Sequence, residues 1–220
     1  MIINQFSFHD KNLNFIVGVG SFVKIGLRKE DIFNLIDIIQ SKYENVIIQF
    51  FNRKLILNIE HIFYACYYSL NAFNLKTNIS SKIGIEFLLY LSANRQIKKA
   101  IKDFGITDFN LNEGLFDYCI ISFDNNLESI NQELIADINA KETEIDLEDY
   151  SIEKLKSIIQ YFGLKHNQII SVLKSYGLII DEIILNKINI KKLIQSLEDL
   201  ICEKMVLLSL EKVTQDQSDI

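Results

Sequence analysis

Short runs of apolar and β-branched residues alternate with longer segments in which apolar residues recur every three or four positions. The runs predict strands over Ile2–Phe8, Leu13–Ile25, Val46–Phe51 and Tyr118–Phe123. The longer period predicts helices over Glu30–Glu44, Asn58–Phe73, Ile83–Leu91, Arg95–Phe104 and Leu127–Ile138. From residue 152 onward the pattern is helical alone, over Ile152–Phe162, His166–Tyr176 and Ile190–Leu210. Strands followed by helices indicate an α+β fold, in which a small mixed or antiparallel sheet packs with helices and a helical extension follows at the C-terminus.

Glycine and asparagine residues mark several predicted boundaries. Gly18 and Gly20 interrupt the second predicted strand and predict a bend or bulge there. Asn58 and Asn94 stand where a side chain caps the following helix, and Gly105 stands where the helix from Arg95 ends.

An acidic stretch, Lys141–Asp149, separates the mixed pattern from the helical one. It alternates charged and apolar residues and lacks the glycine turn of a calcium-binding loop, so we expect a solvated linker over residues 139–150. The predicted core domain then covers residues 1–138, and a helical part over residues 151–212 packs back on it. We expect a polar tail over residues 213–220 to fray.

The composition is that of an ordinary globular protein, with 49% hydrophobic and 24% charged residues among 220. No apolar run approaches the roughly 18 residues of a membrane-spanning helix. The N-terminus lacks the basic and apolar regions of a secretory signal. Three widely spaced cysteines, Cys66, Cys119 and Cys202, indicate buried thiols in place of disulfides. We therefore expect a cytoplasmic protein that does not contact membranes.

Charge is distributed unevenly along the chain. Residues 1–105 contain 13 basic and 8 acidic side chains, a net charge of +5, whereas residues 106–220 contain 10 and 21, a net charge of −11. Eight of the basic side chains and only two acidic ones lie between positions 53 and 102. Such a concentration indicates either a solvated face or a local site for an anion or a nucleic acid.

The familiar catalytic patterns are absent or incomplete. Gly18 and Gly20 follow a strand, but the third glycine of a dinucleotide fingerprint is missing and the next segment stays strand-like. His61 and Cys66 are five positions apart on one predicted helix, which turns their side chains away from each other. The histidines are too scattered for a zinc triad. We expect a non-enzymatic protein without a metal, a cofactor or a small-molecule substrate.

The helix predicted from Arg95 has one basic and one apolar face. Its basic side chains fall at i, i+3, i+4 and i+7 and are Arg95, Lys98, Lys99 and Lys102. The opposite face, which we expect in the core, carries Ile97, Ala100, Ile101 and Phe104. Free amides at the helix N-terminus add to a face that suits phosphates. Nearby tyrosines either stack on unpaired bases or pack in the core, and these are Tyr64, Tyr67, Tyr68 and Tyr90.

The segment Ile85–Ile101 resembles the signature of the TPRKB/CGI-121-like family. It reads IEFLLYLSANRQIKKAI and is similar to the family's S-G-x-R-Q-I-like turn into the next helix, with Ala93 in the glycine position. Shorter similarities lie at Glu60–His61, Ala65 and Thr77–Ser80. The resemblance covers residues 1–138 and resumes at Leu200–Glu211, and the stretch between them is longer than is usual in the family.

The resemblance implies a non-catalytic subunit of the KEOPS complex, which supports formation of N6-threonylcarbamoyladenosine (t6A) in tRNA. It also implies docking on a PRPK-type kinase/ATPase subunit, and through it on the rest of KEOPS, and binding of the single-stranded 3′ CCA end of tRNA. The basic face suits RNA binding independently of the resemblance. We expect phosphate contacts from Arg95, Lys98, Lys99 and Lys102, with Arg53 and Lys54, and base contacts from Asn94 and Gln96.

The last predicted helix is the expected contact with the kinase. Leu197, Ile201, Met205 and Leu208 form one apolar arc, and Val206 and Leu210 lie on another side. An apolar arc of this kind either packs inside the protein or binds a partner.

Two hypotheses about function follow. One is an RNA-binding recruiter that docks on the kinase, and the other is a purely protein-interacting kinase activator or adaptor without direct RNA binding.

Overall fold

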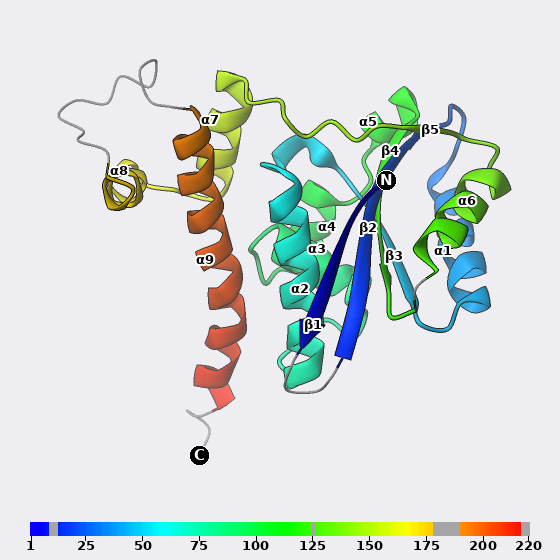
Figure 1. Ribbon diagram of the computed structural model, residues 1–220, viewed down its shortest axis with the longest axis horizontal. Coiled ribbons are helices and arrows are strands. Elements are labelled where there is room, and N and C mark those ends of the chain that lie inside the picture. Colours follow the sequence, from blue (N-terminus) through cyan, green and yellow to red (C-terminus); the bar gives the residue numbers. More distant parts are fainter. Residues whose placement is uncertain (9–12, 125, 178–189, 217–220) are drawn as a thin grey trace.

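The computed structural model describes residues 1–8, 13–124, 126–177 and 190–216, with side chains described as far as residue 210. Its centre is an antiparallel sheet (Figure 1) whose main strands run in the order β1-β2-β4-β3. These strands are β1 (Ile2–Phe8), β2 (Leu13–Val23), β3 (Val46–Phe51) and β4 (Leu115–Ser122). A short strand, β5 (Lys141–Thr143), pairs with β2 beyond the end of β1. The predicted α+β class is confirmed, and the sheet is antiparallel throughout its described pairs.

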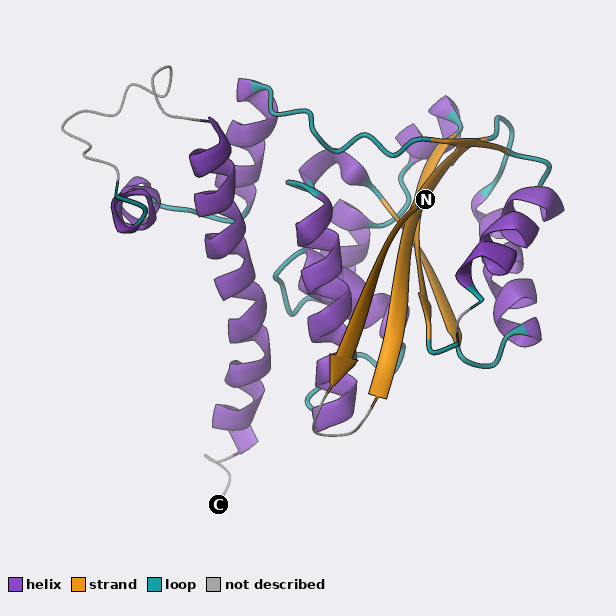
Figure 2. Cartoon of the chain, viewed as in Figure 1, coloured by secondary structure: helices purple, strands orange, loops and turns teal. Residues whose placement is uncertain are grey.

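Helices cover both faces of the sheet (Figure 2). One face packs against α1 (Lys29–Lys42) and α6 (Leu127–Asp137). The other face packs against α2 (Ile59–Leu75), α3 (Ile83–Leu91) and α4 (Ile97–Phe104). Two short elements, η1 (Arg53–Leu55) and α5 (Asp108–Glu113), connect these helices to the strands.

The C-terminal helices form a further layer outside α2 and α3. The long helix α9 (Ile190–Asp216) contacts both of them, α8 (His166–Ser175) lies against α9, and α7 (Ile152–Tyr161) lies against η1. Their buried apolar side chains belong to the same core as those of α2 and α3. The C-terminal helices therefore share a core with the sheet.

Alternation along β4 explains how one strand serves two cores. Phe116 and Ile120 face the core under α1 and α6, whereas Cys119 and Ile121 face the core under α2 and α3. Both sets are buried, so β4 reads as an almost continuous apolar strand at the centre of the sheet.

The predicted bend at Gly18 and Gly20 is wrong. Strand β2 keeps an uninterrupted register with β4 through both glycines, and with β1 through Gly18. A Cβ atom at Gly20 would overlap the hydroxyl of Tyr118, and one at Gly18 would overlap the side chain of Met1. These glycines therefore make room for neighbouring side chains and do not turn the chain.

The predicted elements are all present, but three short ones were not predicted and several boundaries moved by two or more residues. The unpredicted elements are η1, α5 and β5. Strand β4 begins at Leu115, three residues before the predicted start. The prediction missed this start because the charged residue Asp117 interrupts the apolar run, although Asp117 is buried in the structure. An ion pair with Arg53 compensates the buried charge of Asp117.

The acidic stretch is not a solvated linker along its whole length. Its first residues form β5, and Leu147 is buried in the core. The last helix also runs past the predicted boundary, because α9 continues to Asp216 within the predicted tail, and residues 217–220 lie outside the described part of the chain. Within the described residues, no helix combines the length and the apolar character needed to span a membrane.

Candidate nucleic-acid interface

The turn between α3 and α4, Ser92–Gln96, is held by backbone hydrogen bonds that end α3. The amide of Asn94 donates to the carbonyl of Leu89 at 3.1 Å, and the amide of Ala93 donates to the carbonyl of Tyr90 at 2.9 Å. Ala93 has a φ of +45°, the left-handed conformation that glycine favours at a helix C-terminus. This is the position where the family resemblance expects glycine, so the backbone keeps the turn at some conformational cost.

The N-cap of α4 is Gln96, so the prediction that Asn94 caps this helix is wrong. The side-chain oxygen of Asn94 instead accepts a hydrogen bond of 2.9 Å from the amide of Gln96. Asn94 therefore forms an Asx turn that ends at Gln96, the residue just before the first residue of α4. The polar end of the side chain is fixed next to the start of α4.

The lysines of the predicted basic face are exposed, whereas Arg95 is half-buried and precedes α4, and the apolar face is narrower than predicted. Ala100 and Phe104 are fully buried. Ile97 and Ile101, which were expected in the core, keep 39% and 43% of their surface exposed. Helix α4 packs against α3 and η1, and Phe104 also contacts Tyr161, but these contacts leave Ile97 and Ile101 only partly covered. The exposed lysines are Lys98, Lys99 and Lys102.

Arg95 joins the turn to the C-terminal helix. Its Nη1 atom donates a hydrogen bond of 3.0 Å to the main-chain carbonyl of Leu208 in α9. A short hydrogen bond between the hydroxyl groups of Tyr90 and Ser209, 2.5 Å, reinforces the same contact. The end of α3 and the last described side chains of α9 thus lie side by side.

A cavity of about 320 Å³ opens where the turn, α7 and α9 meet. Three cationic side chains from three elements line it, namely Arg95, Lys99 and Lys204. The other lining residues are Ser92, Ala93, Asn94, Tyr161, Phe162, Leu207 and Leu208. Among the described residues that line this cavity, none carries a carboxylate, so the cavity concentrates positive charge.

Tyr161 forms the aromatic wall of the cavity. The Nζ atom of Lys99 lies over its ring, 5.4 Å from the ring centroid. Tyr161 and Lys204 had no local signal in the sequence, because they lie on helices 66 and 109 positions after Arg95 and only folding brings them together.

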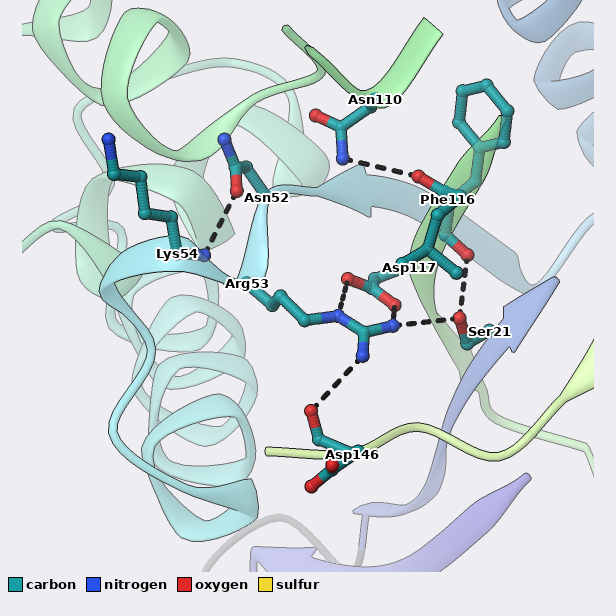
Figure 3. A network of polar contacts seen from close by, with 9 residues as sticks. Ser21, Asn52, Arg53, Lys54, Asn110, Phe116, Asp117 and Asp146 are labelled. Atoms are coloured by element: carbon teal, nitrogen blue, oxygen red, sulfur yellow. Dashed lines mark hydrogen bonds and ion pairs between the residues drawn. The ribbon is translucent and has the colours of Figure 1, made fainter. Parts of the chain in front are cut away.

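Arg53 lies outside this cavity and has a structural role. Its Nε donates to Asp117 Oδ2 at 2.7 Å, and a second, shorter contact joins Nη2 to Oδ1 of the same carboxylate (Figure 3). The guanidinium also donates to Ser21 Oγ at 3.0 Å and to the Asp146 carbonyl at 3.1 Å (Figure 3). Because Asp117 is 1% exposed, this network neutralises a buried charge and ties the acidic stretch to the sheet.

The remaining predicted RNA contacts are exposed and separate from the cavity. Gln96, Lys98 and Lys102 lie on the solvent side of α4. Lys54 is exposed in η1, which packs against α4, and its amide donates to Asn52 Oδ1 at 3.0 Å. Asn94, Arg95 and Lys99 are therefore the predicted residues that the structure gathers in the cavity, whereas Arg53 is turned inward.

The tyrosines considered for base stacking are mostly packing residues. Tyr90 is buried. Tyr64, Tyr67 and Tyr68 are half-buried against the core, and the Tyr68 hydroxyl lies 3.5 Å from Cys202 Sγ. Packing against the core therefore explains why tyrosines stand at these positions, without any contact with a ligand.

Most of the apolar arc expected to bind the kinase is buried inside the chain. Leu197, Ile201, Met205 and Leu208 pack in the core beneath α9, because α2 and α3 cover that side of the helix. The prediction that these four residues form a docking surface is therefore wrong. Val206 is half-buried, whereas Leu207 and Leu210 keep 44% and 54% of their surface exposed.

His61 is a structural residue. Its Nδ1 accepts from the amide of Leu57 at 3.3 Å, and its Nε2 lies 2.9 Å from the carbonyl of Leu91, to which it donates. Burial lowers the pKa of His61 to about 4, so the ring is neutral at physiological pH. Cys66 is buried as a free thiol, and among the described residues no group of three metal-ligating side chains gathers.

Comparison with known proteins identifies a family for this chain. No curated protein matches the chain. The profile of the family described as kinase binding protein CGI-121 matches residues 30–209, which extend from α1 to the end of the described side chains of α9. This match covers most of the 220 residues, and the turn and the cavity lie within it. The chain therefore belongs to the CGI-121 family of kinase binding proteins.

Proposed function

We propose that this protein is a non-catalytic KEOPS subunit that binds a PRPK-type kinase/ATPase and holds the single-stranded 3′ CCA end of tRNA during t6A formation in the cytoplasm. Family membership supports the kinase partner. The observation that carries the RNA-binding part is the cavity at the turn, in which Arg95, Lys99 and Lys204 converge beside an aromatic wall.

The chemistry of the cavity suits the end of an RNA strand. Phosphates are recognised by the planar fork of arginine and by the compact charge of lysine, and both are present. A volume of about 320 Å³ is at the lower end of the range for ligand pockets, so it admits a terminal nucleotide and excludes a duplex stem. Asn94 adds an amide able to orient a base edge.

Exposed lysines outside the cavity extend the proposed contact. Lys98 and Lys102 continue along α4, and Lys54 lies on the adjoining η1. These side chains suit the backbone phosphates that precede the terminal nucleotides. Because single-stranded binding that neutralises a few phosphates loses affinity with a logarithmic slope of about 0.7 per phosphate, we expect the dissociation constant to rise steeply with salt.

We place the kinase contact on the outer side of the described end of α9. Leu207 and Leu210 are exposed there, next to the half-buried Val206. Leu207 also lines the cavity, so the proposed kinase surface and the proposed RNA site are neighbours on one helix.

The alternative is a kinase activator or adaptor that does not bind RNA. It is favoured by the Arg95–Leu208 hydrogen bond, which gives Arg95 a structural role without any ligand. Charge reversal separates the two functions. If RNA binds in the cavity, Lys99→Glu loses tRNA binding and keeps kinase capture, whereas the exposed Lys174→Glu in α8 changes neither. Unchanged tRNA binding by Lys99→Glu would favour the adaptor.

A further inference from the structure

The ring of Tyr161 is held rigidly at the cavity wall. It makes edge-to-face contacts with Phe104, at a centroid distance of 5.4 Å, and with Phe162, at 5.0 Å. Its hydroxyl is buried. Burial, together with the neighbouring Asp103, raises the pKa of Tyr161, so the ring carries no charge at physiological pH. A ring fixed from two sides presents a constant face to the cavity.

Lys99 places its ammonium group over that face. The distance of 5.4 Å from Nζ to the ring centroid is within the range of a cation–π contact. Without the ring, an exposed lysine samples many rotamers, and repulsion from Arg95 and Lys204 drives its charge away from the cavity. The negative face of the ring opposes both effects.

We propose that Tyr161 is a positioning residue for RNA binding, which holds the Lys99 ammonium at the cavity before the RNA arrives. This inference rests on the proposed function and extends it, because it gives α7 a share in RNA binding. A phosphate then meets a charge that is already ordered, so less side-chain entropy is lost on binding.

Two substitutions of Tyr161, in the full chain, separate positioning from a direct contact. Tyr161→Phe keeps the ring, and Tyr161→Leu removes it. Lys99→Met removes the charge that the ring positions. The measurement is the dissociation constant for intact tRNA and for the same tRNA without its 3′ CCA. We expect Tyr161→Phe to bind within about twofold of wild type and Tyr161→Leu to bind intact tRNA about two- to fivefold more weakly. In the Lys99→Met background, Tyr161→Leu causes no further loss.

A spectroscopic measurement follows the position of Lys99 without RNA. Ring current shifts the NMR signals of the Lys99 ε-methylene upfield in wild type and in Tyr161→Phe, and the shift is absent in Tyr161→Leu. Dispersed spectra of each variant show that it is folded.

The outcomes that overturn the inference differ from those that overturn the proposed function. An equal loss from Tyr161→Leu in the Lys99→Met background, or Lys99 signals that do not move in Tyr161→Leu, excludes positioning. Wild-type binding that needs the CCA end, together with an unaffected Tyr161→Leu, refutes the inference alone. Equal binding of wild type to both tRNAs refutes the proposed function and the role of Tyr161 in it.

Discussion

The guanidinium of Arg95 donates a hydrogen bond of 3.0 Å to the main-chain carbonyl of Leu208, 113 positions later in the chain. This bond fixes the turn after α3 to the end of the described side chains of α9. Leu208 is buried, whereas its neighbour Leu207 is exposed and lines the cavity. The proposed RNA site and the proposed kinase surface therefore depend on the same part of one helix.

We expect Leu210→Asp to weaken kinase binding by at least about tenfold, because a charge replaces an exposed apolar side chain at the proposed contact. Its free energy of unfolding should stay within about 0.5 kcal/mol of wild type, since the position is exposed. Titration calorimetry with the purified kinase measures the first effect and urea unfolding the second. Phe33→Asp, at an equally exposed apolar position in α1, is the matched control. A similar loss from both variants would argue against a local surface on α9.

Removing Arg53 should destabilise the protein and leave RNA binding intact. Arg53→Met strands the buried Asp117 carboxylate without its partner, which costs about 3 kcal/mol of unfolding free energy. The double variant Arg53→Met, Asp117→Leu recovers much of this loss, because no unpaired charge stays buried. Urea denaturation checks both values.

The dissociation constant of folded Arg53→Met for tRNA should be within about twofold of wild type, because the guanidinium is engaged away from the cavity. A large loss of RNA affinity in a folded Arg53→Met variant would show that Arg53 contacts the RNA.

Ala93→Gly should stabilise the protein by about 0.5–1 kcal/mol. Ala93 has a φ of +45°, at which a Cβ atom is unfavourable and glycine is not. Ala136→Gly, at an exposed position in the last turn of α6, is the control and should lower the free energy of unfolding. Thermal or urea unfolding compares the two variants. Destabilisation by both would mean that Ala93 does not strain the turn.

The stability of the protein should fall on acidification through the titration of His61. The pKa of His61 is lowered from 6.5 to about 4 by burial, so the unfolded chain binds a proton at a higher pH than the folded protein does. The free energy of unfolding is therefore full above pH 6.5 and falls by up to about 3 kcal/mol as the pH approaches 4. The test is urea unfolding of wild type and His61→Gln across this range. Their difference should shrink at low pH, and a constant difference would contradict the assignment.

Much of the fold is predictable from the sequence, and the elements that were not predicted were missed for physical reasons. Long helices and strands repeat a hydrophobic period several times, so they were predicted. The three residues of β5 and the six of α5 are too short to show a period. The start of β4 was missed because Asp117 is charged. A charged residue is not expected in a buried strand unless its partner, here the distant Arg53, is known.

The candidate site was partly predictable. Asn94, Arg95 and Lys99 lie within six positions of one another, so the sequence predicts that they share one site. Tyr161 and Lys204 come from distant helices, and nothing local marks them. For α9, the hydrophobic period identified an apolar arc, but it could not show which elements pack against that arc. Only the packing of α2 and α3 shows that Leu197, Ile201, Met205 and Leu208 are core residues.

The most direct test of the central claim is the dissociation constant for intact tRNA and for the same tRNA without its 3′ CCA, measured at several salt concentrations with wild type and Lys99→Glu. We predict that wild type binds intact tRNA more tightly, that this preference is lost in Lys99→Glu, and that the affinity falls steeply with salt. Equal, weak binding of both tRNAs by wild type and variant would contradict the account and leave a kinase-binding protein without a tRNA site.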